Sequence, residues 1–171
     1  MTLLTVVRHA KSSWGDPALA DFDRPLNKRG RNAARQIGEE LRKRDFKFDM
    51  VLASPARRVK ETVEGIEQGY GEDLPVQFEP EIYDATESTL FELVRRIPER
   101  AHAPMLVGHN PGLQQLILAL ARDDPNGLLD RIRAGFPTAA VALLEFPVPR
   151  WAEVMEGSGL IRELILPRDL D

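Results

Sequence analysis

Short apolar runs alternate with longer amphipathic stretches along the 171 residues of this chain. Residues 3–7, 49–53 and 104–108 are nearly continuous apolar runs, which are typical of strands covered on both faces. Residues 139–146 and 160–166 predict two further strands, and residues 76–78 predict a short one. Residues 11–25 are rich in Asp, Gly, Pro and Ser and therefore predict a loop.

In most of the segments between these runs, apolar residues recur with the spacing of an amphipathic helix. Residues 27–44 predict a helix capped by Asn27, with the apolar stripe Ala33, Ala34, Ile37 and Leu41. A second helix is expected to start with Ser54 as its cap and Pro55 at its first position, and to end near residues 69–71. Residues 88–97 and 113–121 predict two more helices, and residues 123–136 a loop with a short helix.

This alternation of strands and helices predicts an α/β layer structure with a mainly parallel sheet. No internal repeat, linker or low-complexity segment interrupts the pattern, so residues 1–171 are expected to form a single domain.

Charge and composition restrict the chemistry that the chain can support. With 23 basic and 27 acidic residues the net charge is -4, so neither nucleic acid nor an anionic membrane is an expected partner. The absence of cysteine excludes disulfides, thiolate catalysis and cysteine-ligated metals, and three histidines without an H-E-x-x-H pattern predict no metal site. The N-terminus lacks the features of a signal peptide and no run reaches membrane-spanning length, so a cytoplasmic location is expected.

Cationic and imidazole side chains follow three of the predicted strands. Arg8 and His9 end the first strand, Arg57 and Arg58 follow the second, and His109 follows the strand at residues 104–108. Parallel strands end at the same edge of a sheet, where ligands bind in open α/β folds, so these groups are expected to converge. Guanidinium forks and helix N-termini would suit a tetrahedral dianion such as a phosphoryl group.

Three segments together resemble the histidine phosphatase superfamily: residues 8–10 (Arg-His-Ala), residues 54–62 and residues 107–111. With residues 21–30 included, the chain is more closely similar to the SixA-type branch of phosphohistidine phosphatases. The resemblance covers nearly the whole chain, with the motifs in the correct order. No single motif identifies the family, but the motifs together do. The resemblance implies a three-layer α/β/α fold of the phosphoglycerate mutase-like kind, formed by one histidine phosphatase domain.

The resemblance also implies roles for individual residues. His9 would be the nucleophile that takes the phosphoryl group, and Arg8 would bind its oxygens. Arg58 is favoured over Arg57 because it lies four residues before Thr62, as in the family. His109 would bind the phosphoryl group and stabilise the transition state, without any metal or cofactor.

Three further residues are candidates for substrate binding. Ser12 stands where the family often has a small hydroxyl residue that contacts the phosphate. Asn110 follows His109 in the third motif. Arg24 could line the entrance and touch the substrate, or equally pair with the neighbouring Asp21 or Asp23.

The proton donor for the leaving group remains open in the sequence, because five acidic residues lie in segments that could reach the site: Asp16, Asp21, Asp23, Asp84 and Glu87. SixA-type members resemble this chain in lacking an obvious acid, which suits the labile P–N bond of phosphohistidine. The resemblance therefore implies a phosphatase acting on a phosphorylated protein, such as a histidine-phosphorylated signalling or phosphocarrier protein. The alternatives are a nonspecific phosphatase of small phosphate esters and a non-catalytic phosphate-binding module.

Overall fold

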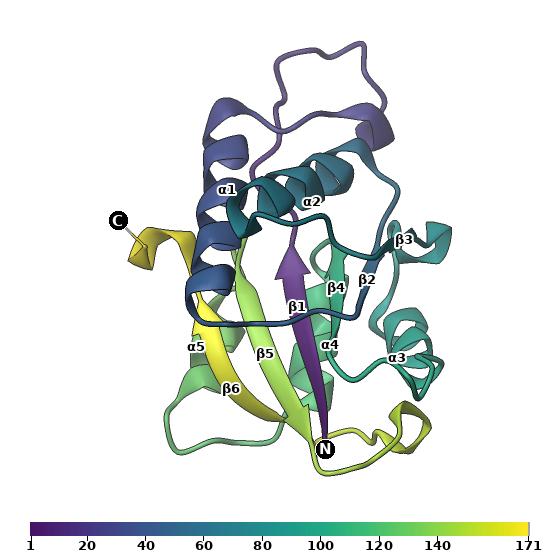
Figure 1. Cartoon of the computed structure of the whole chain (residues 1–171). Coiled ribbons are helices and arrows are strands. Elements are labelled where there is room, and N and C mark those ends of the chain that lie inside the picture. The colour runs from purple at the N-terminus through teal and green to yellow at the C-terminus, as the bar shows by residue number, and fades with distance from the viewer. Residues whose placement is uncertain (171) are drawn as a thin grey trace.

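The computed structural model describes residues 1–170 and arranges them in three layers, with one sheet between two sets of helices (Figure 1). Over these residues the sheet has six strands: β1 (Thr2–Arg8), β2 (Met50–Ala53), β3 (Val76–Phe78), β4 (Pro104–Gly108), β5 (Val141–Phe146) and β6 (Leu160–Ile165). Their order in the sheet is β3-β2-β4-β1-β5-β6. The first four of that order are parallel, whereas β5 is antiparallel to β1 and β6. The predicted mainly parallel sheet is confirmed.

Five α-helices within residues 1–170 cover the two faces of the sheet: α1 (Lys28–Lys43), α2 (Arg57–Tyr70), α3 (Glu87–Arg95), α4 (Gly112–Leu120) and α5 (Leu128–Ala134). Helices α1 and α2 lie in front of the sheet in Figure 1, and α4 and α5 lie behind it. Helix α5 is the short helix expected within residues 123–136. No helix in the described part of the chain is both long and apolar enough to cross a bilayer.

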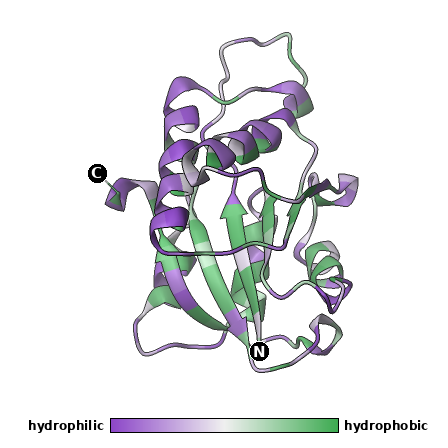
Figure 2. Ribbon diagram, in the orientation of Figure 1, coloured by the Kyte–Doolittle hydropathy of each residue, from purple (hydrophilic) through white to green (hydrophobic). Residues whose placement is uncertain are grey.

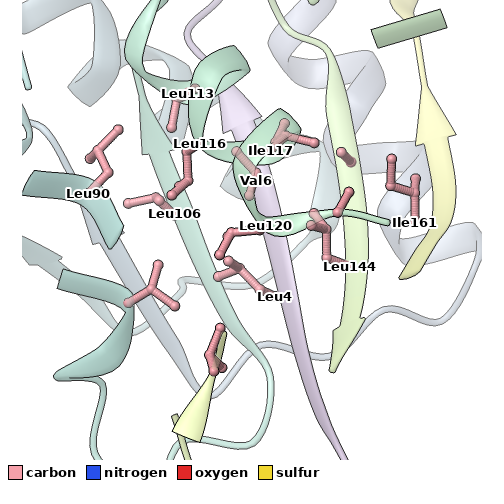
Figure 3. Packing of buried hydrophobic residues seen from close by; sticks show 14 of the residues in the cluster. Leu4, Val6, Leu90, Leu106, Leu113, Leu116, Ile117, Leu120, Leu144 and Ile161 are labelled. Atoms are coloured by element: carbon pink, nitrogen blue, oxygen red, sulfur yellow. The ribbon is translucent and has the colours of Figure 1, made fainter. Parts of the chain in front are cut away.

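Successive strand residues alternate between two hydrophobic cores. Leu4, Val6 and Leu106 pack against α4 residues such as Leu116 on one side of the sheet (Figure 3). Val7 points the other way and joins the core beneath α1 and α2. Since both faces of the strands are covered, the central strands are apolar at nearly every position (Figure 2).

Helices α1 and α2 pack with their backbones in close contact. A Cβ atom at Gly38 would lie 2.1 Å from the carbonyl oxygen of Ile66, and one at Gly69 would lie 2.0 Å from that of Arg35. Glycine is required for this approach because it has no Cβ atom. The contact fixes α2 against α1, and with it the position of Arg58 in the first turn of α2.

One of the two predicted helix caps is confirmed and the other is wrong. The side chain of Asn27 accepts a hydrogen bond from the Gly30 N–H at 2.8 Å, as expected for the cap of α1. Helix α2, however, begins at Arg57, and its cap residue Ala56 makes no side-chain hydrogen bond. Ser54 instead accepts the Ala56 N–H at 3.2 Å within a turn before the helix, which leaves its hydroxyl beside His109.

Candidate active site

The three predicted strand ends converge on one open pocket of about 500 Å³. Parallel pairing sets Arg8 of β1 opposite Gly108 of β4, so the residues that follow, His9 and His109, become neighbours. Their ring centroids are 5.3 Å apart. The pocket is lined by Arg8, His9, Lys11, Ser12, Trp14, Arg24, Arg58, His109, Asn110, Pro137 and Thr138. Each of the seven residues singled out from the sequence is therefore part of its wall.

His9 is held as a neutral imidazole with one free nitrogen. Only 7% of the residue is exposed, and its Nδ1 lies 2.7 Å from the carbonyl oxygen of Ala10. Because a carbonyl can only accept, Nδ1 carries the proton and Nε2 keeps its lone pair. Burial, together with the charges of Arg58 and Arg8, lowers the pKa of His9 to about 4. The side chain therefore has the protonation state that a nucleophile needs at neutral pH.

The backbone around His9 is fixed by two other parts of the chain, α2 and the segment before β5. The Ala10 N–H donates to the Thr62 hydroxyl at 2.9 Å, and that hydroxyl donates to the Arg58 carbonyl at 2.6 Å. The Ala139 N–H donates to the His9 carbonyl at 3.0 Å, and Ala139 adopts a left-handed φ of 61°. A non-glycine residue in that region is strained, and such strain is concentrated at functional sites. The spacing of Arg58 and Thr62 thus reflects a physical link between α2 and the end of β1.

His109 bridges a serine and an arginine. Its Nδ1 lies 3.3 Å from Nη2 of Arg58, and its Nε2 lies 2.8 Å from Oγ of Ser54. An arginine can only donate, so Nδ1 accepts and Nε2 donates to the serine. Burial, with His9 and Arg58 nearby, lowers the pKa of His109 to about 3. Ser54 is not the helix cap that the sequence predicts, and only the folded structure brings its hydroxyl to His109.

Arg58, which the sequence favours, differs clearly in exposure from its neighbour Arg57. The Arg58 side chain is 7% exposed, whereas Arg57 is 53% exposed and pairs with Glu61 at 3.0 Å on the surface of α2. Arg8 donates from Nη1 to the carbonyl oxygen of Phe136 at 3.1 Å. Arg58 therefore lines the pocket, whereas Arg57 does not.

Asn110 lines the pocket, and its side-chain amide also forms hydrogen bonds to two neighbouring segments. Its Nδ2 donates to the Phe136 carbonyl at 2.8 Å, the same oxygen that accepts from Arg8. Its Oδ1 accepts the Gln114 N–H at 3.3 Å. The residue therefore ties α4 to the segment that leads into β5.

Arg24 both lines the pocket and forms an ion pair with Asp21. The residue is 7% exposed and lines the pocket, and its Nη1 donates to the Ser12 hydroxyl at 3.0 Å. Its Nε also pairs with Asp21 at 3.2 Å. The guanidinium is stacked 3.4 Å from the ring centroid of Trp14, which is 77% exposed. Arg24 therefore organises the loop that forms one rim of the pocket.

Asp21 is the one acidic candidate that contacts the cationic groups of the site. Its Oδ2 accepts from the Tyr83 hydroxyl at 2.6 Å and from Arg58 at 3.1 Å. The Tyr83 hydrogen bond and the nearby charge and hydrogen bond of Arg58 lower the pKa of this carboxyl to about 2. Tyr83, which the sequence did not indicate, also packs edge-on against His109, with ring centroids 5.4 Å apart.

The described residues place neither an acidic side chain nor a metal site in the wall of this pocket. Across residues 1–170 no acidic side chain lines the pocket. The other candidate acids are therefore outside its wall: Asp16, Asp23, Asp84 and Glu87. The same part of the chain holds no group of three or more acidic or histidine side chains placed to bind a metal ion. The arrangement is suited to binding an anion and presenting an imidazole to it.

Comparison with known proteins supports this chemistry. Residues 4–87 match the model of the histidine phosphatase superfamily, branch 1. An uncharacterised protein of Mycobacterium tuberculosis is 32% identical over 164 residues, covering 95% of this chain and all of that protein. An uncharacterised phosphatase of Bacillus subtilis is 27% identical over 184 residues, covering 88% of this chain and 92% of that protein.

Two solved structures have the same fold as this chain over almost its full length. A candidate phosphohistidine phosphatase SixA from Agrobacterium tumefaciens superimposes with a TM-score of 0.80 and 27% identity, covering 97% of this chain and 98% of that one. A candidate SixA from Nakamurella multipartitia gives a TM-score of 0.83 and 26% identity, covering 97% and 96%. The chain belongs to the histidine phosphatase superfamily, where it resembles the SixA-type branch.

Proposed function

We propose that this phosphatase, as a single domain over residues 1–171, transfers phosphoryl groups to His9 and then to water. We further propose that its substrate is phosphohistidine in a cytoplasmic protein, such as a signalling or phosphocarrier protein. The observation that carries the proposal is a neutral, oriented His9 in a pocket where Arg58 is held by an ionised carboxylate, Asp21.

In the first step, Nε2 of His9 attacks the phosphorus atom while the bond between phosphorus and the leaving group breaks. Arg8 and Arg58 offer N–H donors to the phosphoryl oxygens, where the negative charge of the transition state is spread. Positioned donors of this kind contribute on the order of 100- to 1,000-fold in rate.

His109 can adapt to the bound phosphoryl group without a change in charge. The Ser54 hydroxyl can either accept from Nε2 or donate to it. When the hydroxyl donates and Arg58 turns from Nδ1 to the phosphoryl group, Nδ1 carries the proton and can form a hydrogen bond to a phosphoryl oxygen. In the second step, water attacks the phosphorus atom on His9, which releases phosphate and returns His9 to its neutral form.

The leaving group decides which substrates suit the site. A carboxyl group with a pKa of about 2 is ionised at neutral pH, so Asp21 holds no proton for the leaving group. Phosphohistidine needs little help because its imidazole ring can itself be protonated near neutral pH and then leaves as a neutral group. From an alkyl phosphate without a proton donor, the leaving group would be a strongly basic alkoxide. This difference supports phosphohistidine over alkyl phosphates.

The shape of the site also supports a substrate presented by a protein. The pocket opens to the surface, and its rim includes the well-exposed Trp14. The two SixA structures compared above are candidate phosphohistidine phosphatases, which agrees with this substrate class.

Rapid mixing and alkaline quenching test the proposed reaction, because phosphohistidine is stable to base and labile to acid. Wild-type protein mixed with a phosphohistidine-bearing protein is expected to show base-stable phosphate on the chain during turnover. The His9→Ala variant should trap none, and the His102→Ala variant serves as control because His102 is exposed and lies outside the pocket. Equal trapping in wild type and His9→Ala would refute the nucleophile. An intact phosphohistidine protein beside rapid turnover of small esters would refute the substrate class.

A further inference from the structure

A second recess adjoins the phosphoryl pocket. It has a volume of about 440 Å³ and shares Arg8, Asn110 and Pro137 with the first pocket. Its own walls include Arg131 of α5 and Arg168, which lies in the 3-10 turn after β6. The proposed chemistry at His9 makes no use of these two arginines.

The wall between the two recesses is well defined. The carbonyl oxygen of Phe136 accepts from Arg8 at 3.1 Å and from Asn110 at 2.8 Å. Gln114 of α4 donates from Nε2 to the Ile132 carbonyl at 2.8 Å, which ties α5 to α4. Arg8 lines both recesses, so a group seated in the second would lie beside the residue proposed to bind the phosphoryl oxygens.

Positive charge is concentrated here although the chain is acidic, with a net charge of -4. The Arg131 side chain is 46% exposed, and within residues 1–170 it makes one ion pair, with Asp169 at 3.6 Å, which is too long for a hydrogen bond. Arg133, only two residues along the same helix, differs because it pairs with Asp130 at 2.5 Å and lines neither recess. The recess therefore presents guanidinium groups that can still bind an anion.

We propose that this recess, bounded by Arg131 and Arg168, is a second anion subsite that binds a carboxylate of the phosphorylated protein. The inference rests on the proposed function and names what the site recognises next to the phosphohistidine: an acidic side chain that lies close to it on the partner's surface. Exposed arginines suit this task, because charge complementarity at an accessible surface steers a partner and selects its orientation. Guanidinium groups also match the planar carboxylate better than an ammonium group would.

Three substrates test the subsite. The first is a histidine peptide phosphorylated with phosphoramidate, in which glutamates flank the phosphohistidine. The second has glutamine in place of each glutamate. The third is p-nitrophenyl phosphate, which has no second anionic group and reports on the phosphoryl centre alone.

The measured quantity is the ratio of kcat/KM for the acidic peptide to that for the glutamine peptide. We expect this ratio to be roughly three to ten in the wild type, as for one or two partly exposed ion pairs. It should fall towards one in the double variant R131Q/R168Q and when salt is added, because salt screens exposed charges. The matched control Arg133→Gln, on the same helix, should keep the wild-type ratio.

Each contrary result has a distinct meaning. Equal rates on both peptides in the wild type would refute the subsite and leave the proposed function standing. An equal loss on all three substrates in R131Q/R168Q would show that the arginines support the phosphoryl centre itself, which also refutes a separate subsite. Turnover of p-nitrophenyl phosphate with neither peptide hydrolysed would refute the proposed substrate class, and the subsite with it. Preference for a small molecule with a phosphate and a carboxylate over both peptides would assign the anion to a metabolite instead of a protein.

Discussion

Replacing Asp21 by asparagine separates two roles that a carboxyl group could play in this pocket. The structure assigns the carboxylate to holding Arg58 and Arg24, at 3.1 and 3.2 Å, and not to giving up a proton. Asparagine is nearly the same size and keeps one oxygen acceptor, but it has no negative charge and no proton to donate as an acid. The backbone carbonyl of Asp21, which accepts from Arg58 at 2.8 Å, is unaffected by the change.

The expected effect follows from the lowered pKa of the carboxyl group. The pKa falls from 3.8 to about 2, mainly through the Tyr83 hydrogen bond and then through Arg58. At about 1.36 kcal/mol for each pH unit, this shift corresponds to roughly 2.5 kcal/mol in favour of the ionised form. Tyr83 accounts for the largest part of this shift, and 51% of the side chain is exposed to water, which screens the charge. The ion pair of Asp21 with Arg58 is therefore assigned about 1 kcal/mol, the upper end for an exposed pair. The variant should therefore lose about fivefold in kcat/KM.

The assay compares esters whose leaving groups differ in basicity: p-nitrophenyl phosphate, phenyl phosphate and an alkyl phosphate. A positioning carboxylate predicts the same modest loss for all three substrates. A general acid would contribute about 100- to 10,000-fold, with the greatest loss for the most basic leaving group. A loss of that size that grows from p-nitrophenyl to alkyl phosphate would refute our reasoning. Asp23→Asn is the matched control, because Asp23 is exposed, belongs to the same short turn and does not line the pocket.

Three further predictions address the nucleophile, its neighbour and the helix contact. Because the pKa of His9 is lowered to about 4, kcat/KM corrected for ionisation of the substrate should stay level from about pH 8 to pH 5. It should fall below about pH 4, where His9 becomes protonated and loses its nucleophilic lone pair; a decline centred on pH 6.5, the ordinary value, would contradict this. Ser54→Ala should lower kcat by roughly three- to tenfold with little change in KM, since Nε2 of His109 loses a hydrogen bond of about 1 kcal/mol. An unchanged kcat would argue against the bridging role. Gly38→Ala should lower the free energy of unfolding by about 2 kcal/mol in urea titration, because its Cβ atom would lie 2.1 Å from the Ile66 carbonyl oxygen. Gly135→Ala, with no atom within 4 Å of the added Cβ, is the control for that experiment.

Local sequence signals predicted elements well where a single physical effect dominates. The apolar run of β1 and the cap at Asn27 are examples, because burial on both faces and a side-chain acceptor near Gly30 are properties of the segment itself. Ser54 has the same local signal as Asn27, but its hydroxyl lies against His109, which is 55 residues further along the chain. A capping rule that considers only neighbouring residues has no access to that contact.

The loop residues show a similar limit. Arg24 could be assigned from sequence to the pocket or to an ion pair with Asp21, and the folded loop satisfies both at once. Tyr83 and Ala139 carry no local sign of function. Their place beside Asp21 and His9 depends on how the chain returns to the carboxyl edge of the sheet.

The sequence by itself determined the layer architecture and the types of group at the three strand ends, because buried strands and amphipathic helices follow from hydrophobic periodicity. The resemblance to the family also favoured Arg58 over Arg57, through the spacing to Thr62. Only the tertiary structure decided the protonation state of His9, the partners of His109, the ionised role of Asp21 and the cationic recess beside the pocket. The reason is physical: pKa values and hydrogen-bond roles are set by burial and by charges from distant segments, which come together only when the chain is folded.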